Sequence, residues 1–563
     1  MPSLDFKGKQ FVYAHHLSVP FRQLDIDKKK SLPKDGKPSL DDNLIIHGDN
    51  LHALKALLPR YAGKIDCIYI DPPYNTGNEG WCYNDKVNAP LIKEWLKDSA
   101  NPVDGEDLER HDKWLCMMWP RLQLLHDLLS ENGVLFVSID DYEAHRLEMI
   151  ISEIFGEDNR VGRICTQFNP KGRHLDKFLA KTHEYVLMFV KNTEQASVNG
   201  LKKDDRMMRE YNKEDEKGAY REIELRNRNR AFNKTTRPNL FYPIYVNPKT
   251  LAISLTKDAN HKEEALPLDG EGNDTCWTWG KEKFNKEKDN LTAKQTQAGT
   301  WRIFRKDYLG EDTRTKPKTI WLDKDMNMDA SRKTLRTILP ECNFDFPKPV
   351  SLITRLLEIA TNENSIILDS FAGTGTTAHA VLALNKEDGG NRKFILAEME
   401  EYANDVTAER VRRVINGVPE ANDEALKEGL GGSFTFCELG QEMNIANLLG
   451  GKNLPSFNEL AHYAFYTATG LSLDDVQQGT DYFIGETENY RVHLIYKPDL
   501  AFLRSGDSAL NMPLAKSISA ARDGTGKSAL VFATHKFMGQ KELADMGITY
   551  CQLPYAIHRI MGD

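Results

Sequence analysis

Short apolar segments alternate with amphipathic segments along much of this chain, which predicts strands separated by helices. Apolar runs of strand length occur at residues 44–47, 65–70, 133–139, 184–190, 365–368 and 393–397. Apolar positions with helical spacing occur at residues 51–58, 121–129, 350–360 and 378–384. Strands that alternate with helices usually form a parallel sheet with helices on both faces. The pattern therefore predicts an α/β protein with a doubly wound sheet.

Breaks in composition divide the chain into segments. Residues 25–43 are polar, a charged stretch begins near residue 191, and residues 416–432 have the Gly, Pro and charge content of a linker. No internal repeat is present. From these breaks we expect five segments: an N-terminal lead-in (1–43), a first half of the sheet domain (44–195), an inserted region (196–335), a second half of the sheet domain (336–415) and a small C-terminal α+β module (433–563).

The composition is that of a globular protein. The 563 residues include 40% apolar and 28% charged residues, and the formal net charge is −9. No apolar run approaches the ~18–20 residues that cross a bilayer, and the first ten residues lack the apolar core of a secretory signal. The eight cysteines form no C-x-x-C pair. We therefore expect a cytoplasmic protein with reduced thiols, no membrane contact and no metal site.

The charge is distributed unevenly. Residues 160–250 hold 20 Lys and Arg against 11 Asp and Glu, and aromatic residues are interspersed among the cations. Clustered cations neutralise phosphates, and aromatic rings stack on unpaired bases. A solvated surface above ordinary core aromatics explains the same composition equally well. If the region binds nucleic acid, the candidate contacts are Arg226, Arg228, Arg230, Lys234 and Arg237.

A chemically specific loop follows the apolar run at residues 65–70. Its sequence is Asp71-Pro72-Pro73-Tyr74, and two consecutive prolines make it rigid. The amino group of a heteroaromatic base is a poor nucleophile because its lone pair is delocalised into the ring. The Asp71 carboxylate and a backbone carbonyl of the proline pair can each accept one N–H and direct that lone pair at an electrophile. Tyr74 offers a ring on which the base can stack.

A second loop has the sequence expected of a nucleoside-binding turn. After the run at 365–368 come Asp369, Ser370, Phe371, Ala372, Gly373, Thr374, Gly375 and Thr376. Gly373 and Gly375 permit a tight turn from strand to helix and close approach by a ligand. The next apolar run ends at Glu398, where an acid can hold a ribose diol. The loop is not a full G-x-G-x-x-G and lacks the Lys of a phosphate-binding loop, so a nucleoside cofactor without a pyrophosphate, such as S-adenosylmethionine, fits it better than NAD.

With these two loops, the chain resembles the permuted β class of DNA amino-methyltransferases. More closely, it resembles the modification subunit of Type III restriction-modification systems. In that class a D-P-P-Y loop precedes an F-x-G-x-G loop, and the target-recognition region lies between them. The resemblance covers roughly residues 40–415. It implies a Rossmann-like sheet in permuted order and transfer of a methyl group to DNA from S-adenosylmethionine.

The resemblance also implies roles for individual residues. Asp71, Pro72, Pro73 and Tyr74 would hold a flipped base, and the first Asp of the motif usually accompanies methylation of adenine N6. Lys348 and Pro349 match the F-x-K-P motif near the methionine end of the cofactor, and Asp49 matches an acidic residue near its adenine. The remaining residues expected to bind the cofactor are Asp369, Phe371, Gly373, Gly375, Thr376 and Glu398. The implied partners are duplex DNA, a second copy of the chain and a restriction helicase-nuclease subunit.

Other functions remain open at this stage. The chain could be a stand-alone adenine or cytosine-N4 methyltransferase, a non-catalytic DNA-recognition subunit, or an amino-methyltransferase of RNA or protein. Residues 521–528 resemble a relaxed phosphate-binding loop that contains Lys527. A helical pattern precedes this loop and a strand pattern follows it, the reverse of the order that binds phosphate. We therefore expect a simple turn there and no ATP hydrolysis.

Overall fold

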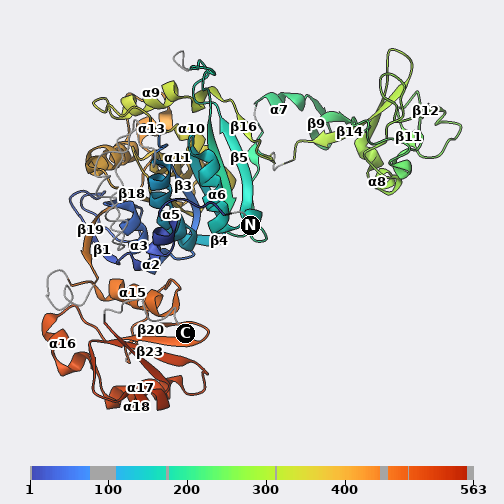
Figure 1. Ribbon diagram of the computed structural model, residues 1–563. Coiled ribbons are helices and arrows are strands. Elements are labelled where there is room, and N and C mark those ends of the chain that lie inside the picture. The colour runs from blue at the N-terminus through green and yellow to red at the C-terminus, as the bar shows by residue number, and fades with distance from the viewer. Residues whose placement is uncertain are drawn as a thin grey trace. The chain divides into compact units, whose positions relative to one another are not determined.

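The computed structural model describes residues 3–76, 110–172, 177–203, 205–310, 314–443, 454–479 and 481–553. The chain forms two compact units (Figure 1). The larger comprises Met1–Asn199 and Pro317–Asp563, and the smaller is Gly200–Lys316. The smaller unit is therefore inserted in the sequence of the larger one, within the region that we expected to be an insertion.

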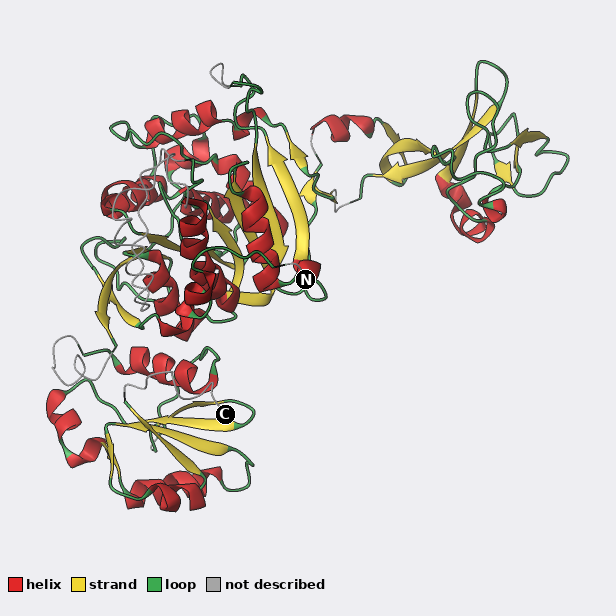
Figure 2. Cartoon of the chain, viewed as in Figure 1, coloured by secondary structure: helices red, strands yellow, loops and turns green. Residues whose placement is uncertain are grey.

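A sheet of ten strands organises the larger unit (Figure 2). In spatial order the strands are β1 (Arg22–Ile26), β19 (Thr435–Glu442), β2 (Leu44–His47), β18 (Lys393–Glu398), β17 (Ile366–Asp369), β3 (Ile65–Ile70), β4 (Leu129–Ile139), β6 (Glu184–Val190), β5 (Arg160–Thr166) and β16 (Ile320–Trp321). Strands β17 and β18 from the second half of the chain thus lie between β2 and β3 from the first half. The expectation of an α/β fold is confirmed.

The sheet is mixed rather than wholly parallel. The six strands from β19 to β4 are parallel, whereas β6 is antiparallel to both of its neighbours. Our expectation of a parallel strand at residues 184–190 was therefore wrong in direction. The reason is that the helix after β4 carries the chain past one strand position to β5, and the chain then folds back into the gap. An apolar run predicts a buried strand but not its direction.

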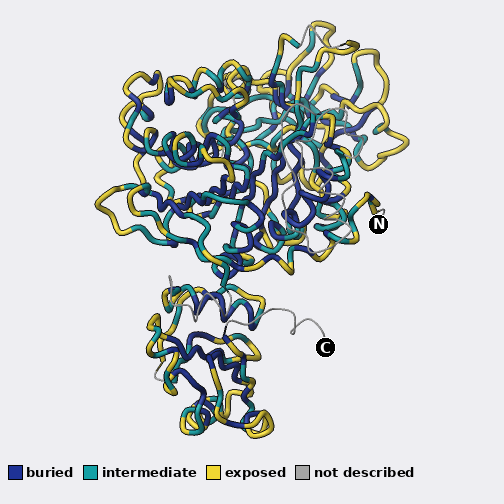
Figure 3. The backbone as a smooth tube through the Cα atoms, turned by 60° about the vertical axis from the view of Figure 1, so that its left-hand side comes forward, coloured by how far each residue is buried: buried dark blue, intermediate teal, exposed yellow. Residues whose placement is uncertain are grey.

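Helices cover both faces of the sheet. One group consists of α3 (Asn50–Tyr61), α5 (Arg110–Leu128) and α6 (Ala144–Phe155), and the other of α10 (Val350–Ala360), α11 (Thr376–Asp388) and α12 (Glu409–Asn416). The connection from β2 to β3 and that from β17 to β18 run in opposite directions along the sheet, so their right-handed crossovers place α3 and α11 on opposite faces. Buried backbone accordingly concentrates in the sheet and the flanking helices (Figure 3).

Three sequence segments contribute differently from our expectation. The lead-in supplies β1, which pairs antiparallel with β19. Strand β19 itself, which we assigned to the C-terminal module, pairs with β2 in the main sheet. Residues from 317 onwards, which we assigned to the insertion, supply β16 beside β5 and then α9 (Met328–Ile338). These pairings join segments that are far apart in the sequence, so composition breaks do not mark them.

The C-terminal module contains a second, four-stranded sheet. Its strands in spatial order are β20 (Phe483–Glu486), β21 (Tyr490–Leu494), β23 (Ser528–Ala533) and β25 (Ile548–Gln552). The main helices are α15 (Phe457–Thr469), α16 (Leu500–Arg504), α17 (Met512–Arg522) and α18 (Gln540–Asp545). Strands β20 and β21 pair antiparallel and form a hairpin. Lys527 lies in the turn between α17 and β23, which confirms the predicted order of helix, turn and strand.

The inserted unit is built mainly from antiparallel strands. One sheet contains β13 (Leu291–Gln295), β14 (Trp301–Tyr308), β9 (Gly218–Glu224) and β8 (Lys213–Asp215), and another contains β11 (Ile253–Ser254), β10 (Ile244–Val246) and β12 (Glu263–Ala265). Helices α7 (Asp205–Glu210) and α8 (Lys281–Glu287) and a short pair, β7 (Leu201–Lys202) with β15 (Arg314–Thr315), complete it. Trp277, Phe284 and Ile303 lie in its core.

None of the helices in the described part of the chain combines the length and the apolarity that crossing a bilayer requires. Within the same residues, no group of three or more His, Cys, Asp or Glu side chains is arranged to hold a metal ion.

Candidate active site

The carboxyl ends of neighbouring parallel strands bring the predicted motifs to one edge of the main sheet. Strand β3 is followed by Asp71, its neighbour β17 ends at Asp369, and the next strand, β18, ends at Glu398. Strand β2, beside β18, ends two residues before Asp49. The two motif loops thus follow adjacent strands of one sheet. This edge is where open α/β sheets bind ligands.

Four polar side chains form a connected network around Asp71. Lys348 Nζ lies 3.1 Å from Asp71 Oδ1 and 3.3 Å from Glu184 Oε2, and it donates to Tyr74 Oη at 2.7 Å. Tyr74 Oη in turn donates to Glu184 Oε2 at 2.8 Å. The side chains of Lys348, Glu184 and Asp71 are only 12%, 16% and 24% exposed. Electrostatic interactions are stronger in such a desolvated site than at a surface.

Burial and charge shift the pKa values in this network. Burial raises the pKa of Asp71 above its ordinary value, and Lys348 only partly offsets that effect. Burial acts to lower the pKa of Lys348, but Asp71 and Glu184 outweigh it, so the net shift is upward. Burial also raises the pKa of Tyr74 far above its ordinary value. Lys348 is therefore a firmly charged ammonium, and Tyr74 keeps its proton at neutral pH.

The loop around Asp71 is held by bonds that the motif alone does not reveal. Trp114 Nε1 donates to the carbonyl oxygen of Pro73 at 2.7 Å. Asn75 is fully buried with φ near 60°, a conformation that Asn tolerates better than most residues. Its Nδ2 donates to the buried Glu143 at 2.5 Å. These bonds hold both ends of the Pro73–Tyr74 segment and so orient the ring of Tyr74.

Sequence reasoning missed several of these residues. Glu184 begins β6 and Trp114 lies within α5, and neither belongs to a recognisable motif. Asn75 does follow Tyr74 directly, and an Asn immediately after a rigid turn is a signal for a left-handed backbone. For Glu184 the signal was a charged residue at the start of an otherwise wholly apolar strand. Because β6 runs antiparallel to its neighbours, its first residue lies at the edge of the sheet where the parallel strands end.

The glycine-rich loop has the tight geometry that was expected. Gly373 and Gly375 have φ values of 51° and 76°, in the left-handed region that favours glycine. A Cβ on Gly375 would lie 3.1 Å from the carbonyl oxygen of Thr407. Asp369 accepts from the amide of Phe371 at 3.0 Å and from Thr377 Oγ1 at 2.6 Å. Both carboxylate oxygens of Asp369 are thus engaged within the loop, which makes this residue a brace of the turn.

The surroundings of the loop fit a nucleoside cofactor such as S-adenosylmethionine. Glu398 is 5% exposed and accepts from the amides of Gly373 at 2.7 Å and Glu400 at 3.0 Å. Burial raises the pKa of Glu398 to about 7. Ser370 Oγ is buried without a hydrogen-bond partner among the described residues. A buried acid and an unsatisfied hydroxyl beside an open glycine turn are suitable groups for polar ribose and amino-acid atoms.

The remaining predicted cofactor residues lie around this turn. Asp49 caps α3 by accepting from the amides of Leu51 and His52. Pro349 is the N-cap of α10, and the backbone oxygen of Lys348 is 3.4 Å from Thr376 Oγ1. Phe371 is partly buried against the main core. Lys348 therefore connects the two loops, since its backbone contacts the glycine turn and its side chain contacts Asp71.

The candidate DNA contacts of the inserted unit differ in availability. Arg226 is 13% exposed and is paired with Glu224 at 3.0 Å, so it is largely used inside the unit. Arg228 and Arg230 are 80% and 67% exposed, although Arg230 approaches Asp269 and Glu271. Lys234 and Arg237 are exposed and lie over the rings of Phe241 and Phe232. The aromatic residues Tyr211 and Tyr242 are buried, which makes them packing residues rather than stacking platforms.

Comparisons with known proteins support this chemistry. The family model described as DNA methylase matches residues 65–409. The EcoPI Mod subunit of a Type III restriction-modification enzyme from Escherichia phage P1 is 34% identical over 455 residues, which cover 76% of this chain and 70% of that protein. The Type II methyltransferase M.KpnI from Klebsiella pneumoniae is 33% identical over 378 residues, which cover 67% of this chain and 84% of that protein.

More distant matches include a further Type III subunit and a solved structure. The StyLTI Mod subunit of a Type III enzyme from Salmonella typhimurium is 28% identical and covers 78% of this chain and 63% of that protein. The solved structure of the M1.HpyAVI–SAM complex covers 65% of this chain and 98% of that chain, at 14% identity and a TM-score of 0.28. At this TM-score the two structures overlap too loosely to equate individual residues.

The match to the family model spans well over half of the chain and includes Asp71, the glycine turn and Glu398. Those are the residues that converge on one edge of the main sheet. The chain therefore belongs to the DNA methylase family and is an S-adenosylmethionine-dependent DNA methyltransferase.

Proposed function

We propose that the chain methylates the N6 amino group of an adenine that is flipped out of duplex DNA. It would do so at a specific sequence, as the modification subunit of a Type III-like restriction-modification system. The observation that carries the proposal is the network of Asp71, Tyr74, Lys348 and Glu184 beside the glycine turn. It combines hydrogen-bond acceptors for an amino group, an aromatic face and a cofactor loop on adjacent strands.

The chemistry needs little from the protein beyond position and electrostatics. Asp71 accepts one N–H of the target amino group. Trp114 already occupies the Pro73 carbonyl, so the Pro72 carbonyl is the better acceptor for the second N–H. The two bonds turn the nitrogen lone pair toward the cofactor, which supplies an electrophilic methyl carbon when bound. The ring of Tyr74 stacks on the base, and its bond to Glu184 keeps that ring in place.

Lys348 would change partners when the base arrives. In the free protein its ammonium lies beside Asp71, close to where the target amino group must bind. The target amino group would compete with the Lys348 ammonium for Asp71, so we expect the base to displace Lys348 toward Glu184. Glu184 is already 3.3 Å away and retains the charge in the site. The raised pKa of Lys348 keeps it protonated during this exchange.

The cofactor residues would divide the work between contact and support. Glu398 would accept hydrogen bonds from the ribose hydroxyls, and Asp49 would lie near the adenine. Gly373, Gly375 and Thr376 would line the backbone side of the pocket, while Asp369 holds the turn in shape. Lys348 and Pro349 would lie near the methionine end, with Phe371 at the side.

The wider assembly is inferred from the relatives. The Mod proteins that match this chain are named as subunits of Type III restriction-modification enzymes. We therefore propose a restriction helicase-nuclease subunit as a partner, a homodimer as the working form and the DNA-containing cytoplasm as the location. The inserted unit would carry DNA specificity, with Arg228, Arg230, Lys234 and Arg237 as its exposed cations and Arg226 as the least available of the five candidates.

A stand-alone methyltransferase is the second candidate. The match to M.KpnI covers 84% of that enzyme, which is named as a Type II methyltransferase and not as a Mod subunit. Purification of the chain from its native host separates the two candidates. A Type III modification subunit should bring a helicase-nuclease chain with it in fixed stoichiometry, and a stand-alone enzyme should not.

The proposed reaction is tested by mapping methylated bases in DNA treated with the purified chain and S-adenosylmethionine. We expect N6-methyladenine in one short sequence motif, and Asp71→Ala should lower the rate by about a hundredfold or more because a transition-state acceptor is lost. Cofactor affinity should change little, since Asp71 lies outside the glycine turn. Methylation only of cytosine, or a near wild-type rate for Asp71→Ala, would contradict the proposal.

A further inference from the structure

An exposed apolar pair projects from a loop at the catalytic edge of the sheet. Phe178 and Leu179 are 85% and 83% exposed, and no other large apolar side chain in the described part of the chain is as exposed. They lie in the connection between β5 and β6, which joins Thr166 to Glu184. Exposure of two adjacent apolar side chains to water is unfavourable in free energy, and burial against a partner would remove that cost.

The legs of this connection are anchored in the catalytic network. The first leg begins at the buried Phe168, whose ring lies 5.4 Å from Lys348 Nζ. The second leg ends at Glu184, the partner of Tyr74. Phe178 is six residues from Glu184, so an extended chain places it within roughly 20 Å of the catalytic pocket. The loop that carries the pair therefore belongs to the surroundings of the catalytic pocket.

The two legs support each other near the projecting pair. Asn169 donates its amide to the carbonyl oxygen of Thr182 at 3.1 Å. Gly172 has φ near 69°, and a Cβ there would lie 2.6 Å from Cβ of Ala180. The legs thus pack backbone against side chain at a position where only glycine fits. The residues next to Phe178 and Leu179 are therefore held by contacts between the two legs.

The charge around the pair matches nucleic acid. Lys177 lies 5.1 Å from the ring of Phe178, and Lys171 lies on the other leg. Lys171 contacts Asp329 at the start of α9, and the amide of Met328 donates to Phe168 O at 3.1 Å. Helix α9 therefore begins at the same edge. The contact between Lys171 and Asp329 is long, at 3.6 Å, and both side chains are largely exposed, so it leaves the lysine accessible to a phosphate.

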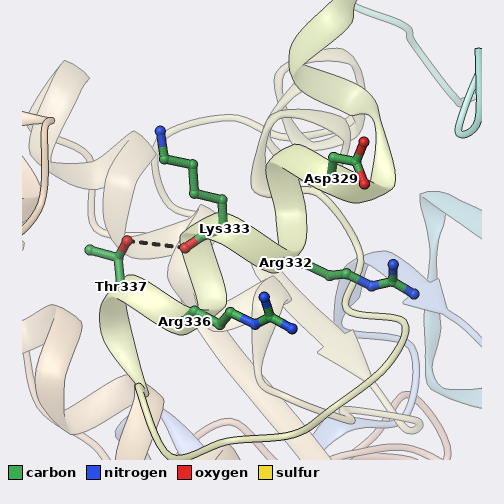
Figure 4. A pocket seen from close by; sticks show the side chains of 5 residues that line it. All are labelled: Asp329, Arg332, Lys333, Arg336 and Thr337. Carbon is green, nitrogen blue, oxygen red and sulfur yellow. Dashed lines mark hydrogen bonds between the residues drawn. The ribbon is translucent and has the colours of Figure 1, made fainter.

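Helix α9 extends this cationic surface. Asp329, Arg332, Lys333, Arg336 and Thr337 line a cavity of about 410 Å³, and Arg332 and Arg336 extend to the same side of the helix (Figure 4). Arg332 also lies over the ring of Phe346. Among the described residues, Lys333 and Arg336 form no ion pair, so their charges remain available to phosphates. This arrangement is complementary to duplex DNA. The cations can contact its phosphates, and the apolar pair can contact the faces of its bases.

We propose that Phe178 and Leu179 enter the base stack of the DNA at the position that the target adenine vacates. The inference rests on the proposed function, because it needs a base that leaves the duplex beside Tyr74. Extrusion of a base leaves a gap whose neighbours have lost their stacking partners. Proteins fill such gaps with apolar side chains, which bury their own surface as they do so. Lys171, Lys177 and the α9 cations hold the adjacent phosphates.

The test compares two duplexes that contain the methylation motif identified for the wild-type chain. In one the target adenine is paired with thymine, and in the other it lies opposite an abasic site. The double variant Phe178→Ala/Leu179→Ala should methylate the paired duplex about tenfold more slowly in a single turnover, since unstacking is no longer offset. On the abasic duplex, where the adenine is already unpaired, its rate should return to within about twofold of wild type.

Controls separate this role from others. Phe537→Ala removes a 67% exposed aromatic side chain of the C-terminal module and should leave both rates unchanged. A duplex with 2-aminopurine at the target position should fluoresce on binding the wild-type chain, and less with the double variant. Equal slowing on both duplexes, or no slowing on either, overturns the proposal. So does a double variant that keeps both rates but changes its oligomeric state, because the pair then belongs to a protein interface.

The outcome is distinguishable from failure of the proposed function. If the wild-type chain does not methylate adenine, the proposed function fails and this inference fails with it. If the wild-type chain methylates adenine and the double variant behaves like wild type on the paired duplex, only the inference fails.

Discussion

Tyr74 Oη donates a 2.8 Å hydrogen bond to Glu184 Oε2. The two residues are 110 positions apart: Tyr74 lies in the loop after β3, and Glu184 is the first residue of β6. The ring that is proposed to stack on the target base is therefore oriented by a carboxylate outside the motif. Since Glu184 also lies 3.3 Å from Lys348, it influences the charge beside Asp71 as well.

Glu184→Gln should lower kcat about tenfold and leave KM for DNA nearly unchanged. Glutamine keeps the shape and an acceptor oxygen, but it removes the negative charge that competes with Asp71 for Lys348. Tyr74→Phe removes the same hydrogen bond and retains the stacking ring. Because one variant weakens and the other removes the same bond between Tyr74 and residue 184, the double variant should be hardly slower than the slower single variant. Strictly additive losses, or a large drop in melting temperature, would point to a general folding defect instead.

Cofactor affinity should fall as the pH decreases through about 7. Burial raises the pKa of Glu398 to about 7, and ribose hydroxyls donate best to the ionised carboxylate. The dissociation constant for S-adenosylmethionine should therefore be up to about tenfold higher at pH 6 than at pH 8. Calorimetry on the wild type and on Glu398→Gln measures this, and the variant should show a weak and nearly flat pH dependence.

The same titration has the opposite sign for the stability of the free protein. At pH values between the ordinary pKa of a glutamate and about 7, the folded chain binds more protons at Glu398 than the unfolded chain does. This contribution to the free energy of unfolding therefore decreases as the pH rises through that window. Burial also raises the pKa of Asp369 to about 7, so Asp369→Asn is the control for any dependence of the unfolding free energy on pH that remains in Glu398→Gln.

An affinity of the wild-type chain for S-adenosylmethionine that is equal at pH 6 and pH 8 would exclude the proposed contact between Glu398 and the ribose.

A matched pair of glycine variants isolates the close contact in the cofactor turn. Gly375 and Gly389 have φ values of 76° and 74°, but of the two only Gly375 has a neighbour, Thr407 O, that an added Cβ would meet within 4 Å among the described residues. Gly389→Ala should cost about 1–2 kcal/mol from backbone strain alone. Gly375→Ala should lower the melting temperature further and weaken binding of S-adenosylmethionine about tenfold, whereas Gly389→Ala should leave that affinity unchanged. Equal effects of the two substitutions would show that the turn tolerates the extra carbon.

Lys527→Ala should leave methyl transfer unchanged, and the isolated chain should not hydrolyse ATP in the presence of DNA. Lys527 Nζ lies 2.8 Å from Glu486 Oε1 at the surface of the C-terminal module, in a turn that leads from a helix into a strand. An exposed ion pair of this kind contributes at most about 1 kcal/mol. Release of phosphate by the wild type and its loss in Lys527→Ala would show that the turn binds nucleotide.

The sequence by itself determined the local chemistry and most of the strands. The rigid loop Asp71-Pro72-Pro73-Tyr74 can be predicted from the sequence because two prolines and the preceding strand pattern constrain the backbone within a few residues. The turn at Gly373 and Gly375 can be predicted because glycine favours the left-handed backbone that this turn from strand to helix requires. The adjacency of the two loops followed from the reaction, which requires the donor and the acceptor to be in contact.

Only the tertiary structure decided which distant side chains complete the site. The direction of β6, the pairing of β1 and β19 and the positions of Glu184 and Trp114 depend on strand pairing and packing between remote segments. A local pattern of apolar residues is the same for a parallel and an antiparallel buried strand, so it carries no information about the partner. Glu184 is the clearest case: its charge is visible in the sequence, but its bonds to Tyr74 and Lys348 exist because β6 folds back beside β4.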